Sequence, residues 1–237
     1  LLFPPKCAFC KEIIPNAEGK KVLICRRCKG GFNYFPKDSV CCICGTYTEN
    51  ETVCLRCSSR TESFFFERNF AVTPYVDDVR RAIYDFKYAG DKRLARLFAE
   101  ITAEYCDFEE ITFADMFIPV PISSGKLKKR RFNQSRLFAD ELSIIFGKKV
   151  ADILLRERET RPQSGLSITE RTANVSGAFS MKNKTEAVSL LKGSSVVIVD
   201  DIFTTGATIN ECAKVIKNYG AEHIFGLTFA AVYKNKN

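Results

Sequence analysis

Cysteines crowd into the first quarter of the chain. Nine of the eleven fall before residue 58, and eight of these form four C-x-x-C pairs. The pairs are Cys7 with Cys10, Cys25 with Cys28, Cys41 with Cys44, and Cys54 with Cys57. Two thiolates three positions apart on a tight turn bind one side of a zinc ion, and a second such turn completes the tetrahedron. The spacing therefore predicts two structural zinc sites.

The cysteine pattern leaves two questions open: whether the cysteines form disulfides or bind zinc, and which pairs share one zinc ion. A disulfide framework needs an oxidising compartment, and the start "LLFPPKCAFC" lacks the long apolar stretch of a secretory signal. Zinc sites can form between sequential pairs, giving ribbons at 7–28 and 41–57, or between interleaved pairs, giving one cross-braced module. We favour the sequential order, in which Gly45 lets the backbone turn beneath the second metal. Cys42, Cys106 and Cys212 are expected to be packing residues.

Composition separates this cysteine-rich part from the rest. About 60 residues with few large apolar side chains do not fold on hydrophobic burial alone, whereas structural zinc contributes about 10–16 kcal/mol. We predict a double zinc ribbon domain at residues 1–62 and a second domain at 63–237. No apolar run reaches the roughly 18 residues of a membrane helix, so we expect a soluble, cytoplasmic protein without membrane insertion. The net charge of +8 suggests an anionic partner, and phosphate esters, nucleic acid or solvent alone are equally compatible with it.

The second part alternates helical and extended patterns. Helices are predicted in "VDDVRRAIYDFKYAG", "DKRLARLFAEITAEYC", "FNQSRLFADELSIIFG" and "ATINECAKVIKNYG", and strands in "MFIPVP", "VVIV" and "HIFGLTFAAV". The two helices at 79–101 are expected to come first. Strands separated by helices indicate an α/β fold with a parallel sheet covered on both faces, and ligands bind such sheets beyond the carboxyl ends of the strands.

The stretch "VVIVDDIFTTGATI" contains the strongest candidate site. We predict a strand at 196–199, a loop at 200–206 and a helix from about Ala207. Backbone N–H groups, a helix N-terminus and the hydroxyls of Thr204, Thr205 and Thr208 can surround a phosphate monoester, with Gly206 allowing close approach. Asp200 and Asp201 can accept hydrogen bonds from sugar hydroxyls. The nucleotide-binding loop G-x-x-x-x-G-K-[ST] is absent from the sequence.

This stretch resembles the phosphoribosyl pyrophosphate motif of type I phosphoribosyltransferases. The order of the cysteine pairs, "FKYAGD", "IPVPISSGKLKKRRFNQ", "QSGLSITERTANVSGAF" and the final motif is similar to that of the ComF family, which includes ComFC and GntX proteins. The resemblance implies a double zinc ribbon followed by a type I phosphoribosyltransferase domain that binds phosphoribosyl pyrophosphate with magnesium. It also implies a role in natural transformation of competent bacteria. Arg131 departs from the family pattern, which usually has glycine there.

Several further residues are predicted to serve the same ligand. The basic run of Lys126, Lys128, Lys129, Arg130 and Arg131 follows a strand that ends at the predicted site, although such runs are also found as solvated turns. The polar segment 156–177 has no apolar period, and the resemblance makes it a mobile loop over the site. The positions carried over from the family pattern are Lys87, Arg161, Gln163, Ser164, Arg171 and Asn174.

Two functions of different classes fit the sequence. One is a magnesium-dependent phosphoribosyltransferase with an unidentified acceptor, in which Asp200 and Asp201 stabilise positive charge on the sugar. The other is a non-catalytic adaptor that keeps the phosphoribosyl pyrophosphate site while ribbons and basic residues hold single-stranded DNA or a competence helicase. No role is assigned to His223, the only histidine.

Overall fold

The computed structural model describes residues 4–15, 22–49, 52–60, 63–160 and 167–233. Its strands are β1 Arg68–Pro74, β2 Met116–Pro119, β3 Lys149–Val150, β4 Leu154–Arg156, β5 Phe179–Met181, β6 Ser195–Phe203 and β7 His223–Ala231. Its longer helices are α3 Asp77–Tyr84, α4 Leu94–Tyr105, α6 Ser124–Arg130, α7 Gln134–Phe146, α8 Ile168–Val175, α9 Lys184–Leu191 and α10 Ala207–Lys217. Shorter ones are α1 Arg26–Gly30, α2 Leu55–Ser58, α5 Glu109–Thr112 and the π-helical turn η1 Asp85–Ala89. Within these ranges no helix has both the length and the apolar character needed to cross a membrane.

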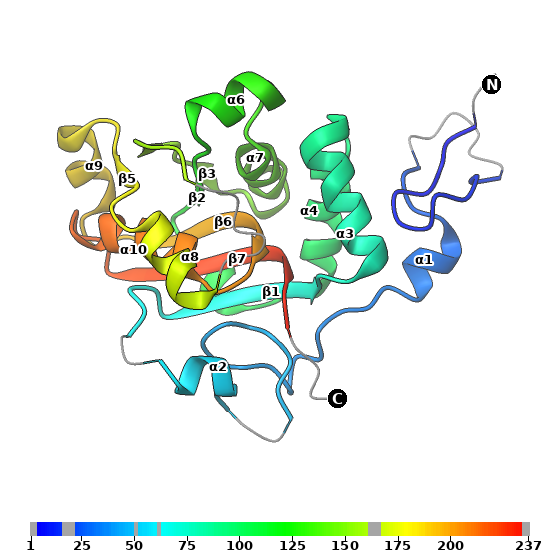
Figure 1. The fold of residues 1–237 in the computed structure, drawn as a ribbon, viewed down its shortest axis with the longest axis horizontal. Helices are drawn as coiled ribbons and strands as arrows, with labels where there is room; N and C mark the ends of the chain where they lie inside the picture. The colour runs from blue at the N-terminus through cyan, green and yellow to red at the C-terminus, as the bar shows by residue number, and fades with distance from the viewer. Residues whose placement is uncertain (1–3, 16–21, 50–51, 61–62, 161–166, 234–237) are drawn as a thin grey trace.

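A five-stranded sheet forms the centre of the larger domain (Figure 1). Its order is β1-β7-β6-β2-β3, and every neighbouring pair is parallel. β4 and β5 make a separate antiparallel pair. The carboxyl ends of parallel strands point in the same direction, and β2 ends beside β6 with Pro119 opposite Val199, while β6 continues to Phe203.

Helices cover both faces of this sheet. The ring of Phe229 on β7 packs against Phe98 of α4, at 4.0 Å between centroids, and against Phe138 of α7. Gly226, three positions earlier, faces Ile209 of α10 instead. Because residues an odd number apart on a strand point to opposite faces, α10 lies on the other side of the sheet from α4 and α7. The predicted α/β class is confirmed.

The four predicted helices are present, but the predicted set of strands is incomplete. The predictions for β2, β6 and β7 identified real strands, whereas β1, which precedes the two early helices, was missed. β1 is buried along nearly its whole length, and its polar residues Asn69 and Thr73 interrupt the apolar run that would have marked it. The expectation that helices come first after residue 62 is therefore wrong.

The cysteine-rich part forms two small units that contact different regions of the larger domain (Figure 1). The first, which contains α1, lies beside α3 and α4, where Lys29 Nζ is 2.9 Å from Glu104. The second, which contains α2, lies along β1, where the N–H of Asn69 donates to the carbonyl of Ile43 at 2.7 Å. The predicted boundary between residues 62 and 63 falls at the edge of the described ranges and stays a prediction.

Candidate functional site

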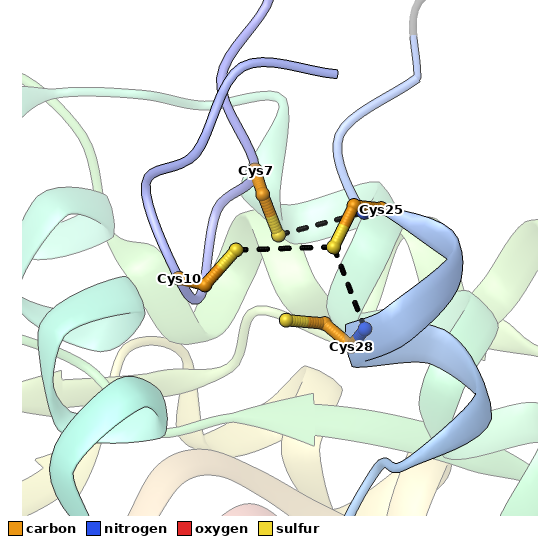
Figure 2. Close-up of side chains that lie close together, drawn as sticks. All are labelled: Cys7, Cys10, Cys25 and Cys28. Atoms are coloured by element: carbon orange, nitrogen blue, oxygen red, sulfur yellow. Dashed lines mark hydrogen bonds between the residues drawn. The ribbon is translucent and has the colours of Figure 1, made fainter. Parts of the chain in front are cut away.

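The eight paired cysteines form two clusters in the sequential order that we favoured. Cys7, Cys10, Cys25 and Cys28 converge in the first ribbon (Figure 2), and Cys41, Cys44, Cys54 and Cys57 in the second. Within each cluster the sulfur atoms lie within 4.8 Å of one another, and the Cys10–Cys25 and Cys44–Cys54 separations are 3.8 and 3.7 Å. Four sulfurs at about 2.3 Å from a zinc ion sit about 3.8 Å apart in a tetrahedron. The clusters therefore fit structural zinc.

The two ribbons repeat one backbone turn. The N–H of Gly45 donates to the carbonyl of Cys41, and the N–H of Lys11 donates to the carbonyl of Cys7. Both turn residues have positive φ, +69° at Gly45 as predicted and +65° at Lys11. This N–H to carbonyl bond closes each metal-binding turn beneath its pair of thiolates.

The remaining cysteines differ from one another. Cys106 and Cys212 are buried and fit the packing role expected of them. Cys42 is exposed, so its predicted packing role is wrong. It directly follows Cys41, which is buried.

The two aspartates of the candidate site belong to a strand, not to the predicted loop. β6 continues through Asp200 and Asp201 to Phe203, because both pair with β7 or lie between paired residues. The loop is thereby reduced to residues 204–206, and α10 begins at Ala207 as expected. The strand backbone therefore places the two aspartates near the carboxyl end of β6, in the middle of the sheet.

Each aspartate has its own partner. The Ser135 hydroxyl at the start of α7 donates to Asp200 Oδ1 at 2.8 Å, and Lys87 of η1 forms an ion pair with Asp201 Oδ2. Burial, together with the charge of Asp201, raises the pKa of Asp200 to about 7. Burial acts on Asp201 in the same direction, but the charge and hydrogen bond of Lys87 outweigh it and hold that pKa below its ordinary value. Of the two carboxyls, Asp200 therefore keeps its proton up to near-neutral pH, whereas Asp201 is ionised well below it.

The short loop is held from within. The N–H of Ala207 donates to the Thr205 hydroxyl at 3.4 Å, and Thr205 is buried. Gly206 has φ +80°, and a Cβ there would lie 2.7 Å from the ring of Phe203. The glycine is thus required by the backbone and by its aromatic neighbour, whatever approaches from outside. Thr204 and Thr208 flank this segment at partly exposed positions.

The basic run lies on a helix, α6, and does not form the solvated turn that was its alternative interpretation. Lys126 and Arg130 of α6 are partly buried, one helical turn apart, whereas Lys128 and Lys129 are exposed. Arg130 donates to Gln134 at 2.9 Å and to the Tyr88 hydroxyl at 3.1 Å. The helix therefore divides the run into an inward pair and an outward pair.

Two residues near the aspartates were not predicted. Besides Ser135, the structure adds Arg156 at the end of β4, which contacts Thr160. Burial lowers the pKa of Lys126, and the charges of Arg156 and Arg130 lower it further. Lys126, Arg130, Arg156 and Lys87 thus surround the carboxylates with cations. The local sequence around Ser135 and Arg156 carries no signal for these roles, because the contacts join distant segments of the chain.

Known proteins resemble both parts of the chain. The family model of the phosphoribosyl transferase domain matches residues 133–236, and that of the double zinc ribbon domain matches residues 1–58. Competence protein F of Haemophilus influenzae is 25% identical over 217 residues, covering 84% of this chain and 93% of that protein. Competence protein ComFC of Bacillus subtilis is 27% identical over 192 residues, covering 76% and 72%. DNA utilization protein YhgH of Salmonella typhimurium is 26% identical over 189 residues, covering 77% and 80%.

The resemblance to the ComF family is confirmed. The chain carries a double zinc ribbon followed by a phosphoribosyl transferase domain, in the expected order. Arg131, where the ComF pattern usually has glycine, has φ +66° and ends α6 in the left-handed region. Arg131 thus places a long side chain at a backbone conformation that glycine adopts without steric cost.

The polar segment shared with the ComF pattern is more ordered than predicted. α8 spans Ile168–Val175 and starts with a capping box between Ser167 and Glu170. Arg171 and Asn174 lie on this helix, next to α10. The predicted residues Arg161, Gln163 and Ser164 lie outside the described residues. His223 starts β7 as expected, and its Nδ1 is 2.9 Å from Glu67.

Proposed function

We propose that the chain binds phosphoribosyl pyrophosphate with magnesium and acts as a phosphoribosyltransferase in DNA uptake by competent cells, in the cytoplasm. The observation that carries this proposal is the junction of β6 and α10. Asp200 and Asp201 lie near the carboxyl end of β6, and the three-residue loop 204–206 leads directly into the N-terminus of an 11-residue helix. Helix N-termini favour phosphate, and adjacent carboxylates favour the hydroxyls of a ribose.

Each group of predicted residues is assigned to one part of phosphoribosyl pyrophosphate. Thr204, Thr205, Gly206, Ala207 and Thr208 are assigned to the 5-phosphate. Asp200 and Asp201 are assigned to the sugar hydroxyls, and the inward cations of α6 to the pyrophosphate. Arg171 and Asn174, which lie on α8 beside α10, are assigned to the segment that covers the bound ligand.

Magnesium fits this arrangement. It is bound in proteins by one or two carboxylates together with the phosphate oxygens of a substrate, and Asp200 and Asp201 are the two neighbouring carboxylates of this site. Bound there, it would neutralise charge on the departing pyrophosphate. Asp200 must give up its proton to take this role, because an ionised carboxylate is the better ligand.

The reaction needs positioning more than covalent help from the protein. The bond between the anomeric carbon and the pyrophosphate oxygen breaks, pyrophosphate leaves with the electron pair, and a nitrogen of the acceptor forms the new bond. Positive charge builds on the sugar between these events, where Asp200 and Asp201 stabilise it. The acceptor's proton leaves to solvent.

Calorimetry with phosphoribosyl pyrophosphate and magnesium tests the binding proposal. We expect binding to the wild type, and weaker binding to a variant carrying both Asp200→Asn and Asp201→Asn. Thr205→Val, which removes a hydroxyl but keeps the shape, is expected to weaken it less, since backbone N–H groups remain. Equal affinity in the double variant would place the ligand elsewhere. Pyrophosphate release, screened with bases, nucleotides and single-stranded DNA, then tests catalysis.

A non-catalytic adaptor remains the second candidate, favoured by the outward lysines of α6. Lys128 and Lys129 are exposed and make no contact that the pyrophosphate assignment needs. Flexible cations of this kind bind nucleic-acid phosphates without reading sequence. In this alternative the site is kept as a sensor, and the ribbons and these lysines hold single-stranded DNA or a helicase.

A further inference from the structure

Arg56 connects the second cysteine cluster to the candidate phosphate loop. It lies on α2, between the ligand positions Cys54 and Cys57. Its Nη2 donates to the sulfur of Cys44 at 3.5 Å, and its Nη1 donates to the main-chain carbonyl of Thr204 at 2.6 Å. Thr204 is the first residue after β6, 148 positions along the chain from Arg56. One guanidinium therefore contacts a metal-ligand position and the loop at once.

The guanidinium of Arg56 also links the loop to the end of β7. Arg56 Nη1 also donates to the carbonyl of Val232 at 3.0 Å, and the N–H of Val232 donates to the carbonyl of Phe203 at 2.9 Å. The planar fork of the guanidinium thus ties the loop to the end of β7. In a trans peptide the C=O and the following N–H point in opposite directions. With its C=O held by Arg56, the peptide after Thr204 directs the N–H of Thr205 away from the ribbon.

The first ribbon contains a matched arginine without this role. Arg27 occupies the same place in its turn, directly before Cys28, as Arg56 does before Cys57. Its side chain is 67% exposed and forms an ion pair with Glu12 of the same ribbon at 3.0 Å. Arg27 therefore has the same chemistry beside an equivalent cluster but contacts its own ribbon.

We propose that Arg56 is a positioning residue that couples the intact second metal cluster to the shape of the 204–206 loop, and so to its affinity for a phosphate monoester. This inference rests on the proposed function only in taking the 5-phosphate as the ligand of that loop. Loss of the second metal would release α2 and with it the hold on the Thr204 carbonyl, whereas loss of the first would leave that hold in place.

The test compares Arg56→Ala and Arg56→Lys with Arg27→Ala. The probes are ribose 5-phosphate, phosphoribosyl pyrophosphate with magnesium, and pyrophosphate with magnesium, measured by calorimetry. Arg56→Ala is expected to weaken both sugar phosphates by the same factor, about tenfold for the loss of a charge-assisted hydrogen bond, and to leave pyrophosphate unchanged. Arg56→Lys keeps the cation beside Cys44 without the fork, so an intermediate loss is expected. Arg27→Ala should bind all three as the wild type does.

Hydrogen exchange provides a readout that needs no ligand. The amides of the 204–208 segment are expected to exchange faster in Arg56→Ala than in the wild type or Arg27→Ala, while zinc content stays at two per chain. If Arg56→Ala loses zinc, Arg56→Lys carries the comparison. Unchanged exchange and unchanged ribose 5-phosphate affinity in a zinc-replete Arg56 variant would overturn the inference. A wild type that binds no sugar phosphate would instead overturn the proposed function, and the exchange rates would still decide the role of Arg56.

Discussion

Asp200 is expected to make stability depend on pH in an unusual direction. With a pKa of about 7 in the folded protein against an ordinary 3.8, it holds its proton more tightly when folded. Between about pH 4 and 7 this carboxyl therefore binds more of its proton in the folded state than in the unfolded state, and its contribution to the free energy of unfolding falls as pH rises. Asp200→Asn removes this contribution. Its unfolding free energy in urea, minus that of the wild type, should increase from pH 4 to pH 7. A constant difference would contradict the raised pKa.

Arg131 offers a second test at the scale of one residue. Its φ is +66°, a backbone conformation that is sterically unfavourable for a residue with a Cβ but not for glycine. Glycine has the opposing effect of increasing the conformational entropy of the unfolded chain. Arg131→Gly is expected to stabilise the protein by about 0.5 to 1 kcal/mol in denaturant unfolding. Lys129→Gly, inside α6 and equally exposed to solvent, is the control and should destabilise by about 1 kcal/mol. The same sign for both variants would contradict the backbone explanation.

Residues whose chemistry lies in local spacing could be predicted, and those that act across the chain could not. The zinc ligands follow from four C-x-x-C pairs, since each turn is built within four residues. Ser135, Arg156 and Arg56 reach their partners only after folding, over separations of 65 residues for Ser135 to Asp200 and 148 for Arg56 to Thr204. Lys87 was named from the family pattern alone, and only the structure gives it a partner, Asp201.

The helix α6 leads to a prediction that separates its two sides. Lys126→Ala with Arg130→Ala removes the inward pair and should weaken phosphoribosyl pyrophosphate by tenfold or more, because each charged hydrogen bond contributes about 1.5–3 kcal/mol. Ribose 5-phosphate, which lacks the pyrophosphate, should bind nearly as before. Calorimetry with both ligands measures the difference.

The outward pair supplies the matched control. Lys128→Ala with Lys129→Ala removes the same charge and should leave both sugar phosphates unaffected. If it instead lowers single-strand affinity and reduces the slope of log K against log salt by about 0.7 per lost phosphate contact, the adaptor function is favoured. Loss of phosphoribosyl pyrophosphate binding in the outward variant alone would contradict the division of the helix.

Elements with a regular apolar period were predicted well, and elements with polar interruptions were not. The ends of α7 and the start of α10 follow from their periods and from the glycines beside them, Gly147 and Gly206. β1 was missed because Asn69 serves the core through hydrogen bonds to Cys44 and Thr228. α8 carried a readable signal in its capping box, Ser167 to Glu170, but its polar composition concealed it.

At the scale of the whole molecule, unfolding of the two ribbons is expected to destabilise the larger domain to different extents. The sequence predicts the cysteine-rich part as a domain of its own, and the second ribbon is hydrogen-bonded to β1 through Ile43 and to the 204–206 loop through Arg56. Cys54→Ser should therefore lower the melting temperature of the larger domain by several degrees. Cys7→Ser should lower it much less.

Zinc analysis and calorimetric melting check this together. The wild type should hold about two zinc ions per chain, and each variant about one. Equal melting temperatures in the two zinc-depleted variants would mean that the contacts of the second ribbon add nothing to the stability of its neighbour.

The paired turns of the ribbons also differ in what natural or laboratory variation they can tolerate. A Cβ at Gly45 would lie 2.3 Å from the carbonyl oxygen of Asn69, because β1 runs directly against that turn. The equivalent turn has Lys11, which keeps a long side chain at the same backbone geometry. In a saturation library selected for folding, position 45 should return glycine alone, while position 11 should return many residue types, asparagine and glycine foremost.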